Sequence, residues 1–221
     1  MKRAYLVLAA LVGLAASPMG PARAATVNLD FSGPNVSASL VLTYGTTTDA
    51  KYPSAFQVTG ISGTFTDTNN GLGIVNAPVN ELVPVVFSTP EPGNLLAPNS
   101  FSRFFVASGL SPISNGAITY DNLYWPNGSV QTASDYPPSG GLFDIYGLMF
   151  RINGNVVVDI WSNGTDERGI ADYGVAVATS ATSLDYRPGG LTVTVPEPTS
   201  LSLLGVGLLG LVALGRRRAA G

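Results

Sequence analysis

The chain has 221 residues and a formal net charge of −3, and it contains neither cysteine nor histidine. A chain of this length forms one domain or two small ones. The two missing residue types exclude disulfide bonds, thiolate or histidine catalysis, and zinc or haem sites built on cysteine or histidine. Any enzymatic chemistry would have to use carboxylates or a serine–lysine pair.

Charged residues are unevenly distributed along the chain. Between Ala25 and Val195 there are 13 acidic residues but only five basic ones. Lys2, Arg3 and Arg23 lie before this span, and a cluster of arginines lies after it. An acidic body of this kind lacks the basic patch through which proteins bind nucleic acid, so we expect no nucleic-acid partner.

The first 24 residues have the three-part layout of a secretory signal peptide. Lys2 and Arg3 provide a positive start, and residues 4–16 are almost wholly apolar. Ala22 and Ala24 then provide the small side chains that a signal peptidase reads. Because the apolar run is short for a membrane span of about 20 residues, we predict a removable signal helix, with signal peptidase cutting after Ala24.

Residues 25–195 predict one all-β domain, an antiparallel β-sandwich with jelly-roll-like connections. Turn-forming residues recur every few positions, separated by stretches rich in β-branched and aromatic residues. Apolar residues alternate from Val27 to Phe31 and from Val36 to Leu42, and Asn153-Gly154 favours a tight hairpin turn. The expected strands cover residues 26–31, 36–44, 55–66, 82–87, 101–106, 117–125, 142–152, 155–162, 173–178 and 191–195.

Three groups of residues in this domain are candidates for a site. Asp67 and Asn69 begin an oxygen-rich segment that is similar to the start of a calcium loop, although a turn between two strands explains the same residues. No other metal and no cofactor are expected.

Asp144 and Asp159 are roughly level across the predicted hairpin and could act as acid and base on a glycoside, although surface carboxylates are the simpler interpretation. The aromatic residues that could form a sugar-stacking platform, or the core instead, are Tyr120, Tyr124, Trp125, Tyr136, Tyr146 and Trp161.

The carboxyl end, residues 196–221, has three parts in a fixed order. Pro196, Glu197 and Pro198 precede an uncharged apolar stretch, about 199–215, which predicts a transmembrane helix near the lower limit of length. Arg216, Arg217 and Arg218 follow, and such a cluster stays on the cytoplasmic side of the membrane. The basic residues near the amino end predict the same side, so the domain between the two ends is expected outside the membrane.

This tail resembles the PEP-CTERM sorting signal. The resemblance implies that an exosortase, a transpeptidase-like membrane enzyme of Gram-negative bacteria, cuts the chain near the Pro-Glu-Pro motif. It also implies a transient membrane-anchored intermediate, then the cell surface or the extracellular space, often together with exopolysaccharide. A permanent single-span anchor is the alternative. A second motif, Pro90-Glu91-Pro92, has no apolar helix or arginine cluster after it and is interpreted as a loop.

Three functions for the domain remain open. The favoured one is a cell-surface or extracellular-matrix protein without catalytic activity, because histidine and cysteine are absent and charged residues are few. The second is a carbohydrate- or calcium-binding adhesion module delivered by the same sorting system. The third is a secreted hydrolase that depends on carboxylates.

Overall fold

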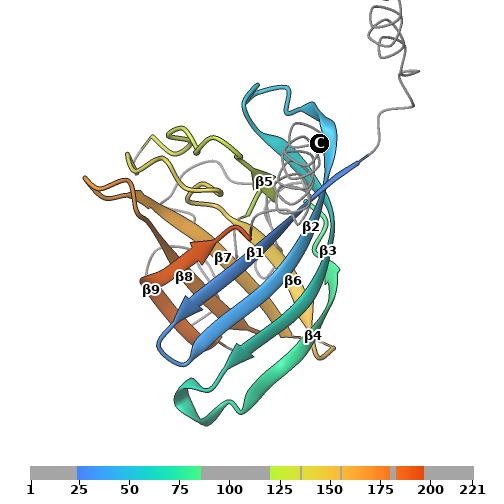
Figure 1. Ribbon diagram of the computed structural model, residues 1–221. Coiled ribbons are helices and arrows are strands. Elements are labelled where there is room, and N and C mark those ends of the chain that lie inside the picture. The colour runs from blue at the N-terminus through green and yellow to red at the C-terminus, as the bar shows by residue number, and fades with distance from the viewer. Residues whose placement is uncertain (1–23, 86–119, 135, 155, 180–182, 197–221) are drawn as a thin grey trace, which may run out of the picture.

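The computed structural model describes residues 24–85, 120–134, 136–154, 156–179 and 183–196. Eight antiparallel strands close into a barrel, in the order β2-β1-β9-β8-β7-β6-β4-β3, and β3 pairs back with β2 (Figure 1). A two-residue strand, β5, adds to the start of β3. The elements are β1 Ala25–Gly33, β2 Val36–Thr48, β3 Phe56–Asp67, the 3-10 turn η1 Asn69–Gly71, β4 Ile74–Leu82, β5 Leu123–Tyr124, β6 Leu148–Ile152, β7 Val156–Thr165, β8 Ala171–Ala178 and β9 Ser183–Thr194.

The all-β antiparallel class is confirmed, but the strands form a closed barrel and not the two separate sheets of a sandwich. Three pairings make the difference. β2 pairs with β3 from Val36↔Asp67 to Thr48↔Phe56, and β4 pairs with both β3 and β6. Alternation along one strand is the same in both architectures, because each buries one face of every strand. The sequence pattern therefore could not distinguish a closed barrel from a sandwich.

Several expected strands have different bounds in the structure. β4 was missed, because Asn76 and Pro78 within it are typical turn residues. Residues 142–147 form a loop before β6, and β9 begins eight residues earlier than expected. The expected strand 101–106 and residues 117–119 lie outside the described residues, as do 1–23 and 197–221 with both predicted helices. Within the described part of the chain, no helix has the length and apolar character to span a membrane.

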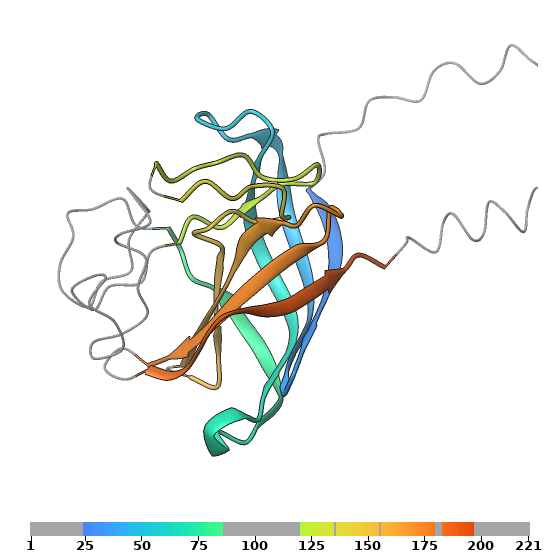
Figure 2. The same cartoon turned by 90° about the vertical axis from the view of Figure 1, so that its left-hand side faces the viewer.

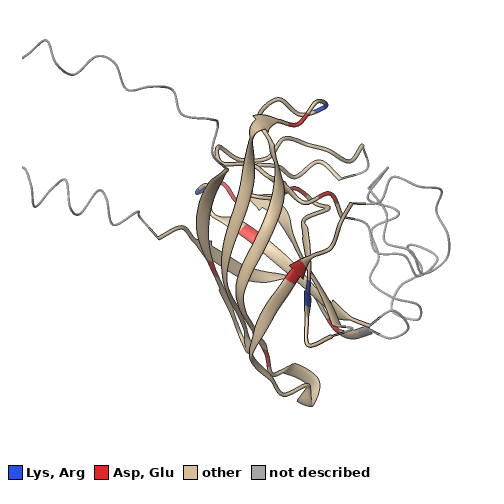
Figure 3. Ribbon diagram, turned by 90° about the vertical axis from the view of Figure 1, so that its right-hand side faces the viewer, with Lys and Arg blue, Asp and Glu red and all other residues tan. Residues whose placement is uncertain are grey.

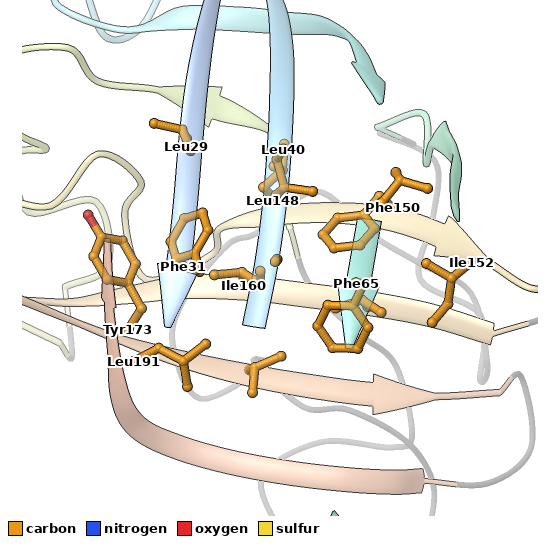
Figure 4. Packing of buried hydrophobic residues seen from close by; sticks show 14 of the residues in the cluster. Leu29, Phe31, Leu40, Phe65, Leu148, Phe150, Ile152, Ile160, Tyr173 and Leu191 are labelled. Carbon is orange, nitrogen blue, oxygen red and sulfur yellow. The ribbon is translucent and has the colours of Figure 1, made fainter. Parts of the chain in front are cut away.

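The barrel core follows the predicted alternation. Val36, Ala38, Leu40 and Leu42 of β2 are buried, as are Leu29 and Phe31 of β1. Aromatic rings in the core join elements that are not hydrogen-bonded neighbours in the barrel, as Figure 4 shows for the labelled residues. The Phe31 ring stacks on Phe143 with centroids 6.0 Å apart and meets the edge of Tyr173 at 5.2 Å, and Phe65 meets Phe150 at 6.1 Å. These contacts join strands that are distant in the sequence.

Strand β7 is buried on both faces. Val158 and Ile160 belong to the barrel core, whereas Val157 and Trp161 pack on the opposite face in a second apolar cluster. That cluster also contains Val83, Tyr120, Ala133, Ile145, Tyr146, Met149, Ala176 and Ala178. The polar side chain of Asp159 lies between Val157 and Trp161 in the alternation and is therefore carried into this second cluster.

The barrel has two different ends. At one, which we call the hairpin end, lie the β1–β2 turn, η1 and the β6–β7 turn; at the other, the loop end, lie the connections 49–55 and 166–170. Because β1 begins and β9 finishes at the loop end, the first and last described residues leave the barrel on the same side (Figure 2).

Gly63→Ala should weaken the β2–β3 pairing that closes the barrel. Gly63 lies opposite Leu40 with φ +138°, and a Cβ there would lie 2.0 Å from the Ser39 carbonyl oxygen. The backbone would have to move, so we expect a loss of roughly 3 kcal/mol in the free energy of unfolding, measured by urea denaturation. Gly60→Ala is the control, because a Cβ there makes only ordinary contact, 3.5 Å from Thr43 Cβ. Equal losses for the two variants would contradict this account.

Candidate functional site

The predicted sorting motif begins at Pro196, two residues after the last paired residue of β9. β9 pairs with β1 at three positions, the last of which is Asp30↔Thr194. Only Val195 separates this pair from Pro196, and both of these residues are exposed. Glu197, Pro198 and the arginines 216–218 lie outside the described residues, as does Ala22 of the predicted peptidase site. The structure therefore describes where the motif is attached.

The edge of β1 is open beside this attachment point. β1 pairs with β2 along its whole length, from Ala25↔Tyr44 to Gly33↔Val36. On its other side, among the described residues, only Asp30, Phe31 and Ser32 have a partner in β9. Residues 25–29 thus present a strand edge with no described neighbour, next to the start of the tail.

The proposed calcium loop is held together by its own hydrogen bonds. Asp67 ends β3, and its Oδ1 accepts the backbone N–H of Asn69 at 2.9 Å. The side-chain amide of Asn69 donates to Asp185 Oδ2 at 2.9 Å, while its Oδ1 accepts from Asn35 at 3.2 Å and from the Arg187 guanidinium. The turn interpretation explains these contacts fully. No group of three or more possible metal ligands occurs in the described residues, and calcium binding by Asp67 and Asn69 stays a prediction.

Asp67 is nevertheless electrostatically unusual. Its side chain is buried, and its Oδ2 has no hydrogen-bond partner within the described residues. Burial raises the pKa of Asp67 to about 6; the nearby Asp185 carboxylate also raises it, against the lowering effects of the Asn69 N–H and of Arg187. Asp67 therefore takes up its proton in mildly acidic solution.

Asp67→Asn should stabilise the protein at pH 7.5 and have little effect at pH 4. The folded-state pKa lies above the ordinary value, so the favourable contribution of Asp67 is complete below about pH 4 and is lost as the pH rises through about 6. Asparagine keeps the bond to the Asn69 N–H without the charge, so we expect a gain of roughly 1–3 kcal/mol at pH 7.5. Urea denaturation at both pH values measures it.

The control for this prediction is Glu167→Gln, which removes one negative charge from an exposed residue. It should show no comparable dependence on pH. A gain from Asp67→Asn that is the same at pH 4 and pH 7.5 would show that the buried charge is not its source.

Asp144 and Asp159 are both buried, which corrects the interpretation of them as surface carboxylates. Asp159 lies opposite Met149 in the pairing of β6 with β7. The backbone carbonyl of Asp144 accepts the N–H of Ser162. Asp144 therefore lies beside Ser162, and the two carboxyl-bearing residues are not level. Asp144 Oδ1 accepts the N–H groups of Tyr146 and Gly147 at 2.9 and 3.2 Å. Within the described residues, Asp144 Oδ2 and both oxygens of Asp159 have no hydrogen-bond partner.

These two carboxyl groups and the half-buried Asp121 hold their protons more tightly than usual. Burial raises the pKa of all three, and the charge of Asp144 raises the pKa of Asp121 and Asp159 further. A protonated acid is a candidate general acid. However, the exposed fractions of Asp144 and Asp159 are only 2% and 1%, so this arrangement presents no acid–base pair to a substrate.

Most of the candidate aromatic platform is core. Of the six residues named from the sequence, Tyr136 is half-buried and the other five are buried. The exposed ring is one that sequence reasoning missed: Tyr186, 40% exposed, stacks on Trp161 with centroids 5.7 Å apart. Asn163 Oδ1 accepts from Trp161 Nε1 and from the Tyr136 hydroxyl, both at 3.1 Å. Tyr186 was missed because β9 was expected to begin only at residue 191.

Comparison with known proteins identifies the tail. The PEP-CTERM protein-sorting motif matches residues 194–218, which begins at the last residue of the β9 strand and includes Pro196, Glu197 and Pro198. This confirms the resemblance seen in the sequence. The motif implies an exported protein that an exosortase processes and that is sorted to the cell surface; it indicates no activity. Comparison with curated proteins and with solved structures gives no match.

Proposed function

We propose that this chain is a cell-surface or extracellular-matrix protein of a Gram-negative bacterium, and that its barrel has no catalytic activity of its own. The observation that carries the proposal is the sorting motif over residues 194–218. In this account signal peptidase removes residues 1–24, the apolar stretch 199–215 holds the chain in the membrane, and the arginines at 216–218 stay in the cytoplasm. An exosortase then cuts near Pro196, Glu197 and Pro198.

The short distance between barrel and membrane supports cutting at the membrane. The β9 strand ends at Thr194, and the predicted membrane helix begins near residue 199. Five extended residues span at most roughly 18 Å. The loop end of the barrel would therefore face the bilayer until the tail is cut, and the hairpin end would point away from the cell.

The surface of the barrel supports a structural role. Figure 3 shows few charged residues over the described strands. The exposed positions of β2 and β3 are instead rich in hydroxyl groups, including Ser37, Ser39, Ser62 and Thr64. Neutral hydroxyl-bearing surfaces can exchange hydrogen bonds with sugars as they do with water, which suits a protein that lies in an exopolysaccharide layer.

Replacing both prolines of the motif, Pro196→Ala with Pro198→Ala, should leave membrane insertion intact and block cutting. Intact mass spectrometry of the protein from a host with the cognate sorting enzyme should give wild-type chains that lack residues 1–24 and the apolar tail, while the variant keeps the tail. The control, Pro90→Ala with Pro92→Ala, changes the other Pro-Glu-Pro and should be cut normally. Wild-type surface protein that still includes Leu201–Gly221 would show that the tail is a permanent anchor.

Carbohydrate binding is the second candidate, and the exposed Tyr186 ring on Trp161 favours it, because flat exposed aromatic rings stack on sugars. Tyr186→Ala should then lose most of the binding on a glycan array, with and without calcium. Tyr52→Ala is the matched control, since Tyr52 lies against a different buried tryptophan, Trp125, with centroids 5.4 Å apart. No binding by the wild type, or equal binding by all three proteins, would eliminate this candidate.

A further inference from the structure

The described part of the chain contains the dipeptide Asn-Gly four times, at residues 70–71, 127–128, 153–154 and 163–164. All four share one possible reaction, in which the backbone nitrogen of the glycine attacks the side-chain amide carbon of the asparagine. Glycine allows this approach because it has no Cβ to obstruct it. Since the four dipeptides are identical, the fold determines which of them reacts fastest.

The pair at 163–164 is the most firmly held. Asn163 Oδ1 accepts hydrogen bonds from Trp161 Nε1 and from the Tyr136 hydroxyl, both at 3.1 Å. Its Nδ2 donates to Asp172 Oδ2 at 2.8 Å. The Gly164 N–H is engaged as well, because it donates to a neighbouring serine hydroxyl at 3.0 Å. Ring closure at this pair would require all of these hydrogen bonds to break.

Two further pairs are each held by one hydrogen bond. The side-chain amide of Asn70 donates to Asp185 Oδ1 at 3.0 Å. The N–H of Gly128, which belongs to the attacking nitrogen of the pair at 127–128, donates to the Trp125 carbonyl at 3.1 Å. In both cases the bond has to break before the ring can close, and the reactive arrangement is rarer by the free energy of that bond.

The fourth pair, Asn153 and Gly154, lies in open solvent. Both residues are exposed, and a Cβ placed on Gly154 would meet no atom of the surrounding structure within 4 Å. Within the described residues, neither the Asn153 side chain nor the Gly154 N–H takes part in a hydrogen bond. The amide carbon and the attacking nitrogen are therefore both accessible and unrestrained.

The turn that carries this pair can rotate without disturbing the barrel. Asn153 and Gly154 have φ angles of 40° and 76°, and the pairing of β6 with β7 begins beside them at Ile152↔Val156. Ring closure needs the Asn153 amide carbon to reach the Gly154 nitrogen, which requires rotation only within the turn. Exposed turns open at a small cost in free energy.

We propose that Asn153 is a site of spontaneous covalent modification. The Gly154 backbone nitrogen forms a bond to the side-chain amide carbon of Asn153, and the bond from that carbon to the amide nitrogen breaks. The leaving nitrogen takes up the proton of the Gly154 N–H, so ammonia is released and a succinimide ring remains. Water then adds to either carbonyl of the ring and opens it, which leaves aspartate or isoaspartate in place of the asparagine.

Both products change the hairpin end of the barrel. Each has a carboxylate where Asn153 has a neutral amide. Isoaspartate also carries the backbone through its Cβ, so the turn becomes longer by one carbon atom, and the length of a hairpin loop fixes the register of its strands. The reaction needs only water, so the converted fraction increases with the age of the folded protein. This modification is independent of the proposed function.

Peptide mass spectrometry of the full chain, folded in detergent micelles and incubated at pH 7.5, locates the reaction. Trypsin cuts after Arg151 and Arg168, so one peptide, 152–168, contains both Asn153 and the firmly held Asn163. Fragmentation of this peptide assigns the exchange of an NH₂ group for OH to one of the two. Asn153 should be converted about tenfold or more faster than Asn163. Equal conversion of the two residues would overturn the proposal.

The same incubation compares Asn153 with the two pairs that are held by a single bond. Asn153 should react about threefold or more faster than Asn70 and Asn127, and a faster reaction at either of these would contradict the proposal. Incubation in urea is the control, because unfolding removes every restraint and should make the rates at all four asparagines similar. A preference for Asn153 that persists in urea would show that the fold is not its source.

Asp185→Ala tests whether hydrogen bonding to the asparagine side chain controls the rate. This variant removes the acceptor of the Asn70 amide, so conversion of Asn70 should rise about threefold or more, while Asn153 in the same chain should react as in the wild type. Asn163 reports whether the variant is folded, because its conversion stays slow only in the intact barrel. An unchanged rate at Asn70 in the folded variant would overturn the proposal; if the variant unfolds, the wild-type comparison of Asn153 with Asn163 still decides it.

Discussion

The rest of the structure depends on how β1 closes the barrel. β1 bonds to β2 along nine residues but to β9 along only three. The approach between β1 and β9 is close, since a Cβ on Gly33 would lie 2.8 Å from the Gly190 carbonyl oxygen. This short seam is sufficient to enclose the core around Phe31. Among the described residues, positions 25–29 of β1 have no partner on the β9 side, at the loop end, where the first and last described residues leave the barrel.

Buried carboxyl groups give the barrel a second common property. Asp67 at the hairpin end and Asp144 and Asp159 under the second apolar cluster are all removed from water, and burial raises the pKa of each. Each therefore favours the protonated folded state and loses its contribution as the pH rises. The exposed Asp166 differs, because the N–H of Ile170 and the Arg168 guanidinium, 2.7 Å away, hold its pKa below the ordinary value. Burial, more than the net charge of the domain, therefore determines the pKa of these three carboxyl groups.

Local patterns predicted the parts of the fold that local chemistry controls. Alternation placed Leu29, Phe31 and the apolar residues of β2 in the core, and Asn153-Gly154 joins β6 to β7 with both residues at positive φ. The same rules missed β4, where Pro78 pairs with Thr64 within a strand. They also placed Asp159 at the surface, because a run that is buried on both faces is interrupted there by one polar residue.

The sequence by itself determined that the chain is exported, that it is all-β, and that it ends in a sorting motif, because each of these depends on the order of residue types along a short segment. Only the tertiary structure decided that the strands close into a barrel, that Asp67, Asp144 and Asp159 are buried, and that the described part of β9 pairs with β1 at three positions. These depend on which strands become neighbours and in what register, and pairing across the chain is set by the sum of many weak contacts. The sorting motif belongs to both: its residues were legible in the sequence, but its position directly after the β9–β1 pairing, which ends at Asp30↔Thr194, is a property of the folded barrel.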